Sequence, residues 1–127
     1  MYNDKVLEHF QNPRNIGEIE DADGIGIEGD PGCGDYIKLY IKVKDNRLID
    51  VKIKVHGCAA AIATGSTLTE LAIGKYLDDA MMIHEDDVLE ALGGLPEEKA
   101  HCSNLGVAAL KEAIWDYVFR SNLKKQD

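Results

Sequence analysis

Residues 36–56 read YIKLYIKVKDNRLIDVKIKVH, and the side chains alternate between apolar and polar on both sides of a central Asp45-Asn46 pair. Alternation with a period of two is the pattern of half-buried strands. Asp-Asn is a pair that favours a tight turn between such strands. The stretch therefore predicts a β-hairpin with one buried face and one wet face. The residues expected on the buried face are Ile37, Leu39, Ile41, Val43, Val51, Ile53 and Val55.

The segment before this hairpin predicts a third strand. Ile25 and Ile27 alternate with Gly24, Gly26 and Glu28, which fits a glycine-rich strand at the edge of the sheet. We expect the three strands to form an antiparallel meander.

Helical patterns flank the strands. A short N-terminal amphipathic helix is expected over residues 2–11, where Asn12-Pro13 ends it. Further helices are expected over residues 59–74, 85–92 (closed by Gly93-Gly94) and 104–123. Because the strands come first and most helices follow, the predicted fold class is α+β, with the helices packed mainly on one face of the sheet.

The bulk composition fits one soluble domain spanning residues 1–127. The chain has 45% apolar residues and no apolar run long enough to cross a bilayer, so we expect no membrane contact. A formal net charge of −9 argues against nucleic-acid binding, which requires clustered lysine and arginine. The N-terminus lacks the pattern of a secretory signal, and we expect a cytoplasmic protein.

Three cysteines carry the chemistry. Cys33 lies in PGCGD, Cys58 in VHGCAA and Cys102 in KAHCS, each at an expected boundary between elements. An odd cysteine count favours metal ligation or reactivity over a disulfide framework. Asp35 and His101 lie beside two of the thiols, so the set predicts a metal or cluster site with three thiolates and one non-thiolate ligand. The alternative is that the three are ordinary small buried residues.

Helix starts are expected to influence two of these thiols. Cys58 precedes the helix over residues 59–74, and Cys102 precedes the last helix, with Ser103 or Asn104 as its cap. The positive end of a helix dipole favours a thiolate, so both sulfurs are predicted to be reactive or metal-binding.

The other histidines are expected to be surface residues. His9 and His84 show no pattern of ligands, and His56 falls on the lysine side of its strand. His56 is therefore a poor ligand candidate although it lies close to Cys58.

Four short motifs, in order, resemble one known family. The chain is similar to the IscU-type iron–sulfur cluster assembly scaffolds, a group that includes the N-terminal domain of NifU. The resemblance rests on NPRNIG at residues 12–17, GCGD at 32–35, GCAAAIA at 57–63 followed by Ser66, and HCS at 101–103.

The resemblance implies a function and roles for the site residues. Cys33, Cys58 and Cys102 would be thiolate ligands of a nascent [2Fe–2S] cluster, and Asp35 or His101 would complete the coordination. Cys102 would be the first acceptor of persulfide sulfur from a cysteine desulfurase of the IscS/NifS type. The chain would be a scaffold, not an enzyme, that receives iron and electrons from donors and passes its cluster to apo acceptor proteins.

The family pattern also bears on partners. Tyr2 matches a tyrosine implicated in pairing of scaffold subunits, which implies a possible homodimer. The chaperone-recognition stretch LPPVK is replaced by Leu95-Pro96-Glu97-Glu98-Lys99. Because desolvating Glu97 and Glu98 is costly, we do not expect dependence on a dedicated Hsp70 chaperone.

Two other functions use the same residues. A SufU-like zinc-dependent sulfur acceptor or shuttle would bind zinc through the cysteines and Asp35, although the extra segment of SufU relatives between the second and third cysteines is not apparent here. A thiol-dependent hydrolase would use Cys102 as nucleophile and His101 as base. Adjacent residues rarely present both groups to one substrate atom, which disfavours the hydrolase.

Overall fold

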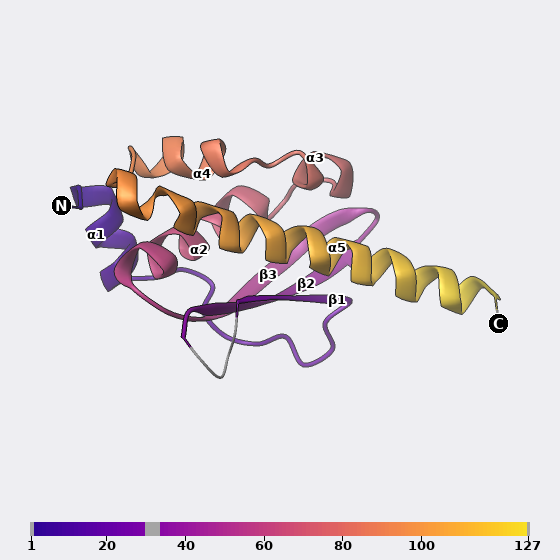
Figure 1. Ribbon diagram of the computed structural model, residues 1–127. Helices are drawn as coiled ribbons and strands as arrows, with labels where there is room; N and C mark the ends of the chain where they lie inside the picture. The colour runs from indigo at the N-terminus through magenta and orange to yellow at the C-terminus, as the bar shows by residue number, and fades with distance from the viewer. Residues whose placement is uncertain (1, 30–33, 127) are drawn as a thin grey trace.

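The computed structural model describes residues 2–29 and 34–126, with side chains described through Leu123. Cys33 therefore lies outside the described residues. The elements, shown in Figure 1, are α1 (Asp4–Gln11), β1 (Gly24–Gly29), β2 (Tyr36–Lys44), β3 (Arg47–His56), α2 (Ala59–Ala72), α3 (Leu77–Met81), α4 (Glu85–Leu92), the 3₁₀ helix η1 (Glu97–Cys102) and α5 (Ser103–Gln126).

The three strands form one antiparallel sheet in the order β1-β2-β3, which confirms the predicted meander. The β2–β3 hairpin turns at Asp45 and Asn46, whose φ angles are +54° and +62°. Two consecutive residues with positive φ are the signature of the type I′ turn, which matches the twist of the strands.

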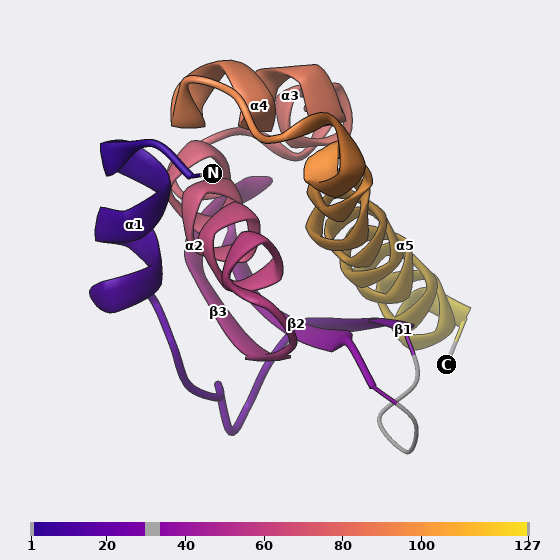
Figure 2. The same cartoon turned by 60° about the vertical axis from the view of Figure 1, so that its left-hand side comes forward.

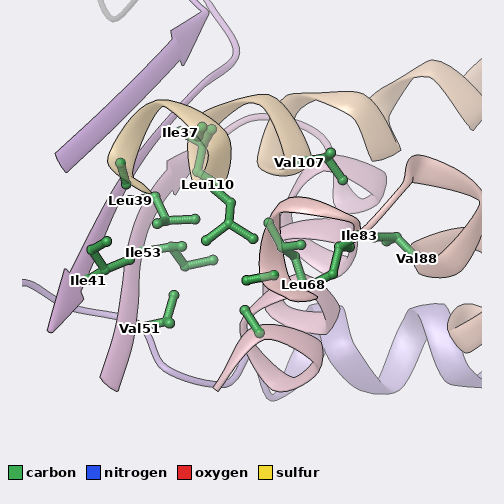
Figure 3. Close-up of a cluster of buried hydrophobic side chains, with 14 of the residues drawn as sticks. Ile37, Leu39, Ile41, Val51, Ile53, Leu68, Ile83, Val88, Val107 and Leu110 are labelled. Atoms are coloured by element: carbon green, nitrogen blue, oxygen red, sulfur yellow. The ribbon is translucent and has the colours of Figure 1, made fainter. Parts of the chain in front are cut away.

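The helices cover one face of this sheet. Figure 2 shows α2 and α5 side by side over the strands, with α4 farther from the sheet and α1 beside α2. The core lies between the sheet and the two long helices, as Figure 3 shows. Its largest fully buried side chains include Ile37, Leu39, Ile41, Ile53, Leu68 and Leu110. The α+β class, the N-terminal helix and the long C-terminal helix are confirmed. None of the described helices combines the length and the apolar character that a bilayer span requires.

The opposite face of the sheet is less open than the alternation predicted. The backbone of Ile53 in β3 exchanges hydrogen bonds with Asn15 and Gly17, each 2.9 Å long. The chain then crosses the outer face toward β1, and ion pairs hold it to the lysine side chains there: Glu18 with Lys54 at 2.7 Å and Asp21 with Lys42 at 3.0 Å. Tyr40 on this face is consequently only 4% exposed.

Strand β1 packs against α5 through its glycines. Gly24 and Gly26 are buried, whereas Ile27 is exposed. A Cβ atom at Gly26 would overlap the carbonyl oxygen of Ala109 and lie 2.8 Å from the backbone nitrogen of Ala113. The absence of a side chain thus lets the strand and helix backbones touch directly.

A polar network fastens α1 and the loop after it to α2. His9 Nδ1 lies 2.8 Å from the hydroxyl oxygen of Ser66, which also accepts a 2.9 Å bond from the backbone N–H of Arg14. Asn15 adds a bond from its side-chain amide to Thr69 Oγ1 at 2.9 Å. The Pro-Arg-Asn segment therefore has a structural role in docking α1, which the resemblance alone did not reveal.

The expectation that His9 is a surface residue is wrong. Its side chain is only 14% exposed, and burial is the main cause that lowers its pKa. The reason is tertiary: α1 presents His9 to Ser66 on α2, a contact between residues 57 positions apart.

Replacement of Ser66 with alanine tests this network. Ser66→Ala leaves the N–H of Arg14 without its acceptor, and we expect a loss of about 1–2 kcal/mol in the free energy of unfolding. Thr67→Val is the matched control, because the buried Thr67 hydroxyl has no hydrogen-bond partner among the described residues. The control should leave the stability unchanged or higher. Urea unfolding followed by circular dichroism measures both, and equal destabilisation by the two changes would contradict the assignment.

Candidate functional site

Two of the three predicted thiols converge. The sulfurs of Cys58 and Cys102 lie 4.0 Å apart, although 44 residues separate them in sequence. Cys58 occupies the N-cap position of α2, at the end of the turn that follows β3. Cys102 ends η1, just before α5. The two helices that cover the sheet thus bring one thiol each to a shared place.

A cleft of about 200 Å³ opens beside Cys102. Asp35 and His101, the two predicted non-thiolate candidates, both line it, and His101 Nε2 lies 3.9 Å from the Cys102 sulfur. The other lining residues are Glu28, Ala61, Asn104 and Leu105. The cleft therefore brings together a thiol and an imidazole from η1 and a carboxyl group from the segment before β2.

Gly57 makes room for the carboxyl group of Asp35. A Cβ atom on Gly57 would lie 2.9 Å from Asp35 Cγ and 3.0 Å from its Oδ1. The glycine before Cys58 is thus needed for the Asp35 side chain to pack beside the Cys58 loop.

The third predicted thiol, Cys33, lies outside the described residues, which resume at Gly34. Within the described ranges, no three histidine, cysteine, aspartate or glutamate side chains are grouped closely enough to hold a metal ion. Asp35, two positions after Cys33, lines the cleft.

The expectation that Cys102 sits at a free helix start is wrong. Helix η1 runs directly into α5, and the Ser103 N–H is already bonded to the carbonyl groups of Ala100 and His101. The Ser103 hydroxyl donates to Ala100 as well, at 2.8 Å, and does not cap α5 as an acceptor. Burial, followed by the neighbouring Cys58, raises the pKa of Cys102 to about 11. Both causes favour the neutral thiol of Cys102 over its thiolate.

Two residues at this site, Thr64 and Glu28, were not predicted from the sequence. The buried Thr64 hydroxyl on α2 lies 3.3 Å from the carbonyl oxygen of Cys102, as well as 2.8 Å from that of Ala60. Glu28 on β1 lines the cleft and shares a hydrogen bond with Glu112 of α5, which raises the Glu28 pKa to about 7. Neither belongs to a motif, so only the tertiary fold connects them with the cysteines.

The remaining histidines lie where the sequence predicted. His56 is exposed on the outer face of the sheet, where its ring stacks on Tyr36 at a centroid distance of 6.1 Å. His84 is exposed and caps α4 by accepting a 3.2 Å bond from the Asp86 N–H.

Comparison with known proteins agrees with this architecture. A family profile described as the NifU-like N terminal domain matches residues 1–124. The iron–sulfur cluster assembly scaffold protein IscU 1 of Archaeoglobus fulgidus is 61% identical over 124 residues, which cover 98% of this chain and 80% of the relative. IscU of Escherichia coli K12 is 45% identical over 127 residues, covering 97% of this chain and 98% of the relative.

Solved structures share the fold. A protein from Fervidobacterium islandicum, described as a putative iron–sulfur cluster assembly scaffold protein for the SUF system, superposes with a TM-score of 0.71 at 23% identity, covering 89% of this chain and 96% of that one. A NifU-like protein (N-terminal) from Brucella abortus gives a TM-score of 0.72 at 21% identity, with coverages of 93% and 94%. With the profile match along almost its whole length and relatives at 45% and 61% identity, this chain belongs to the family of NifU-like N-terminal domains that includes the IscU proteins.

Proposed function

We propose that this protein is a scaffold on which a [2Fe–2S] cluster is assembled and from which it passes to apo acceptor proteins. The observation that supports this most is the 4.0 Å approach of the Cys58 and Cys102 sulfurs beside a cleft that also holds Asp35 and His101. The relatives at 61% and 45% identity are named iron–sulfur cluster assembly scaffold proteins. The cluster is cargo, which the protein holds between assembly and release.

The proposed ligands are the thiolates of Cys33, Cys58 and Cys102, completed by Asp35 or His101. Iron prefers thiolate sulfur, and binding displaces the thiol proton, so the raised pKa of Cys102 makes metal loading and proton release one coupled event. An oxygen or nitrogen in the fourth position binds iron less tightly than a fourth thiolate would. This mixed ligand set suits a cluster that must leave.

In the proposed order of steps, sulfur first arrives from the persulfide of a cysteine desulfurase. The Cys102 thiolate attacks the outer sulfur of that persulfide, the sulfur–sulfur bond of the donor breaks, and the donor leaves as a thiolate. Before the attack Cys102 loses its proton, and we assign His101, 3.9 Å away, as the acceptor. Reduction of the transferred sulfur to sulfide takes two electrons from an external electron donor.

The proposed partners are the desulfurase, the iron and electron donors and the acceptor proteins, in the cytoplasm. Glu97 and Glu98 are exposed at the start of η1, five and four residues before Cys102. We propose that this acidic stretch disfavours binding to a dedicated Hsp70 chaperone, and that the protein does not depend on one. Pairing of two copies through Tyr2 stays a prediction.

Anaerobic reconstitution tests the proposed function against the zinc alternative. The protein as purified, without metal removal, is incubated with ferrous iron and sulfide, desalted, and analysed for iron, zinc, sulfide and visible absorption. A scaffold gives a reddish-brown protein with charge-transfer bands and equal amounts of iron and sulfide. Tightly held zinc that iron and sulfide do not displace would favour the colourless zinc-dependent sulfur shuttle.

Replacement of Asp35 with alanine tests the role of the carboxylate. If its oxygen is the readily exchanged ligand, Asp35→Ala should lengthen the lifetime of the bound cluster several-fold when a chelator competes for iron. Decay of the visible absorption under anaerobic conditions measures the lifetime. Asp86→Ala, a change at an exposed carboxylate on α4, is the control and should not alter it. A lifetime equal to or shorter than that of the unmodified protein would count against the proposal.

A further inference from the structure

The outward face of α5 carries an apolar stripe. Trp115 and Phe119 are each 64% exposed and Leu123 is 48% exposed, and the spacing of four residues places all three along one side of the helix. Figure 1 shows that this end of α5 extends beyond the sheet. Three neighbouring large apolar side chains in water form a patch of the kind that marks an interaction surface.

The stripe borders a shallow groove between α5 and the edge strand β1. The groove encloses about 590 Å³, and we call it the α5 groove. Its lining residues are Ile25, Glu112, Trp115, Asp116, Phe119 and Arg120. It thus combines apolar side chains with two carboxyl groups.

The two carboxyl groups differ in their partners. Asp116 pairs with Arg120 at 2.8 Å and accepts the N–H of Ile25 at 2.9 Å, so its charge is neutralised. Glu112 instead shares a hydrogen bond with Glu28, and within the described part of the chain no lysine or arginine forms an ion pair with either glutamate. That hydrogen bond, with burial and the nearby charge of Glu112, raises the pKa of Glu28. When both carboxyl groups are ionised they repel each other, and a cation supplied from outside would relieve this repulsion.

The same glutamate pair connects the groove with the thiol site. Glu112 lines the α5 groove, and Glu28 lines the cleft that contains Cys102. A molecule seated in the groove with a cation between the two glutamates would therefore border the thiols.

We propose that the α5 groove is the docking site of a partner protein that presents a segment with arginine or lysine beside large apolar side chains. The apolar side chains would cover the stripe, and the cation would reach Glu112 and Glu28. Exposed aromatic rings such as Trp115 also attract a guanidinium group. A second copy of this chain fits less well, because it would bring the same glutamates, and Arg120 in its groove is already paired with Asp116.

The fluorescence of Trp115 can report docking in the α5 groove. Trp115 is the single tryptophan of the chain, so its fluorescence reports on the groove alone. The probe is a synthetic 12-residue helical peptide with leucine at positions four apart, flanked by arginines. Saturable binding should shift the emission to shorter wavelength and protect it from acrylamide. A peptide with glutamate in place of each arginine should bind at least about tenfold more weakly, since it repels Glu112 and Glu28.

Two variants assign the binding to the groove. Phe119→Ser should weaken the arginine peptide at least about tenfold, as expected for a central apolar anchor. Glu112→Gln should weaken it about fivefold and reduce the preference over the glutamate peptide. Met82→Ser and Glu20→Gln are matched controls at exposed positions elsewhere, Met82 being 78% exposed, and both should bind as the unmodified protein does.

The test separates this proposal from the proposed function. The Cys58→Ser variant should bind the arginine peptide as the unmodified protein does. The Phe119→Ser variant should still assemble a cluster from ferrous iron and free sulfide. Emission that the peptide does not change, or equal affinity for the two peptides, would overturn the docking proposal. The docking proposal would also be overturned if the Trp115 emission shifted with protein concentration in the absence of peptide and the protein sedimented as a dimer. A second copy of the chain would then occupy the groove.

Discussion

Cys58→Ser and Cys102→Ser are each expected to abolish stable cluster binding. Each change replaces a soft sulfur ligand with a hydroxyl group of similar size, and the two sulfurs lie 4.0 Å apart in the unmodified protein. Loss of residues that merely support a metal ligand costs about 10–100-fold in metal affinity, so loss of a ligand should cost at least as much. Iron, sulfide and visible absorption after anaerobic reconstitution and desalting measure the effect.

The fold is the control for these two variants. Cys102 is 7% exposed and Cys58 is at the N-cap of α2, where serine is a favourable residue. Circular dichroism should therefore show an unchanged fold, and Cys58→Ser should be at least as stable as the unmodified protein. Full iron and sulfide retention by either well-folded variant would remove that cysteine from the ligand set.

Gly26→Ala is expected to destabilise the fold strongly. The new methyl group would overlap the carbonyl oxygen of Ala109, and backbone atoms cannot move aside as a flexible side chain can. Overpacking of this kind costs about 3 kcal/mol in the free energy of unfolding. For a chain of this length we expect the thermal midpoint to fall by roughly 10 °C.

Gly34→Ala is the matched control for this prediction. Nothing lies within 4 Å of a Cβ atom at Gly34, and its φ angle is not in the left-handed region. The same chemical change there should leave thermal unfolding within about 0.5 kcal/mol of the unmodified protein. A thermal midpoint that is equally low for both variants, or unchanged for Gly26→Ala, would contradict the close approach of β1 to α5.

The sheet was predictable because its signals are local. The alternation on both sides of Asp45-Asn46 specifies strands, and those two residues supply the turn. The orientation of β1 depends on something else, the backbone of α5 about 85 residues later, which requires Gly24 and Gly26 to face inward. Helix α3, with five residues, was not foreseen, because its length gives too little periodicity to recognise.

The candidate site was predictable only in part. Cys58 lies at the N-cap of α2 as its position after a strand and before a helical pattern suggested. The prediction that Cys102 lies at a free helix start was wrong, because no sequence signal indicated η1. The last turn of η1 satisfies the Ser103 N–H that a free helix start would leave without an acceptor. Glu28 joins the cleft through the packing of β1 on α5, which no short motif encodes. The role of Cys33 stays a prediction.

The central claim is that thiols from three distant segments hold one cluster. A crystal structure of the anaerobically loaded protein, with iron located by anomalous scattering, tests it directly. We predict a single pair of iron sites in contact with the sulfurs of Cys33, Cys58 and Cys102, with Asp35 or His101 as the remaining protein ligand. Iron bound elsewhere on the molecule, or bound without both Cys58 and Cys102, would contradict the claim.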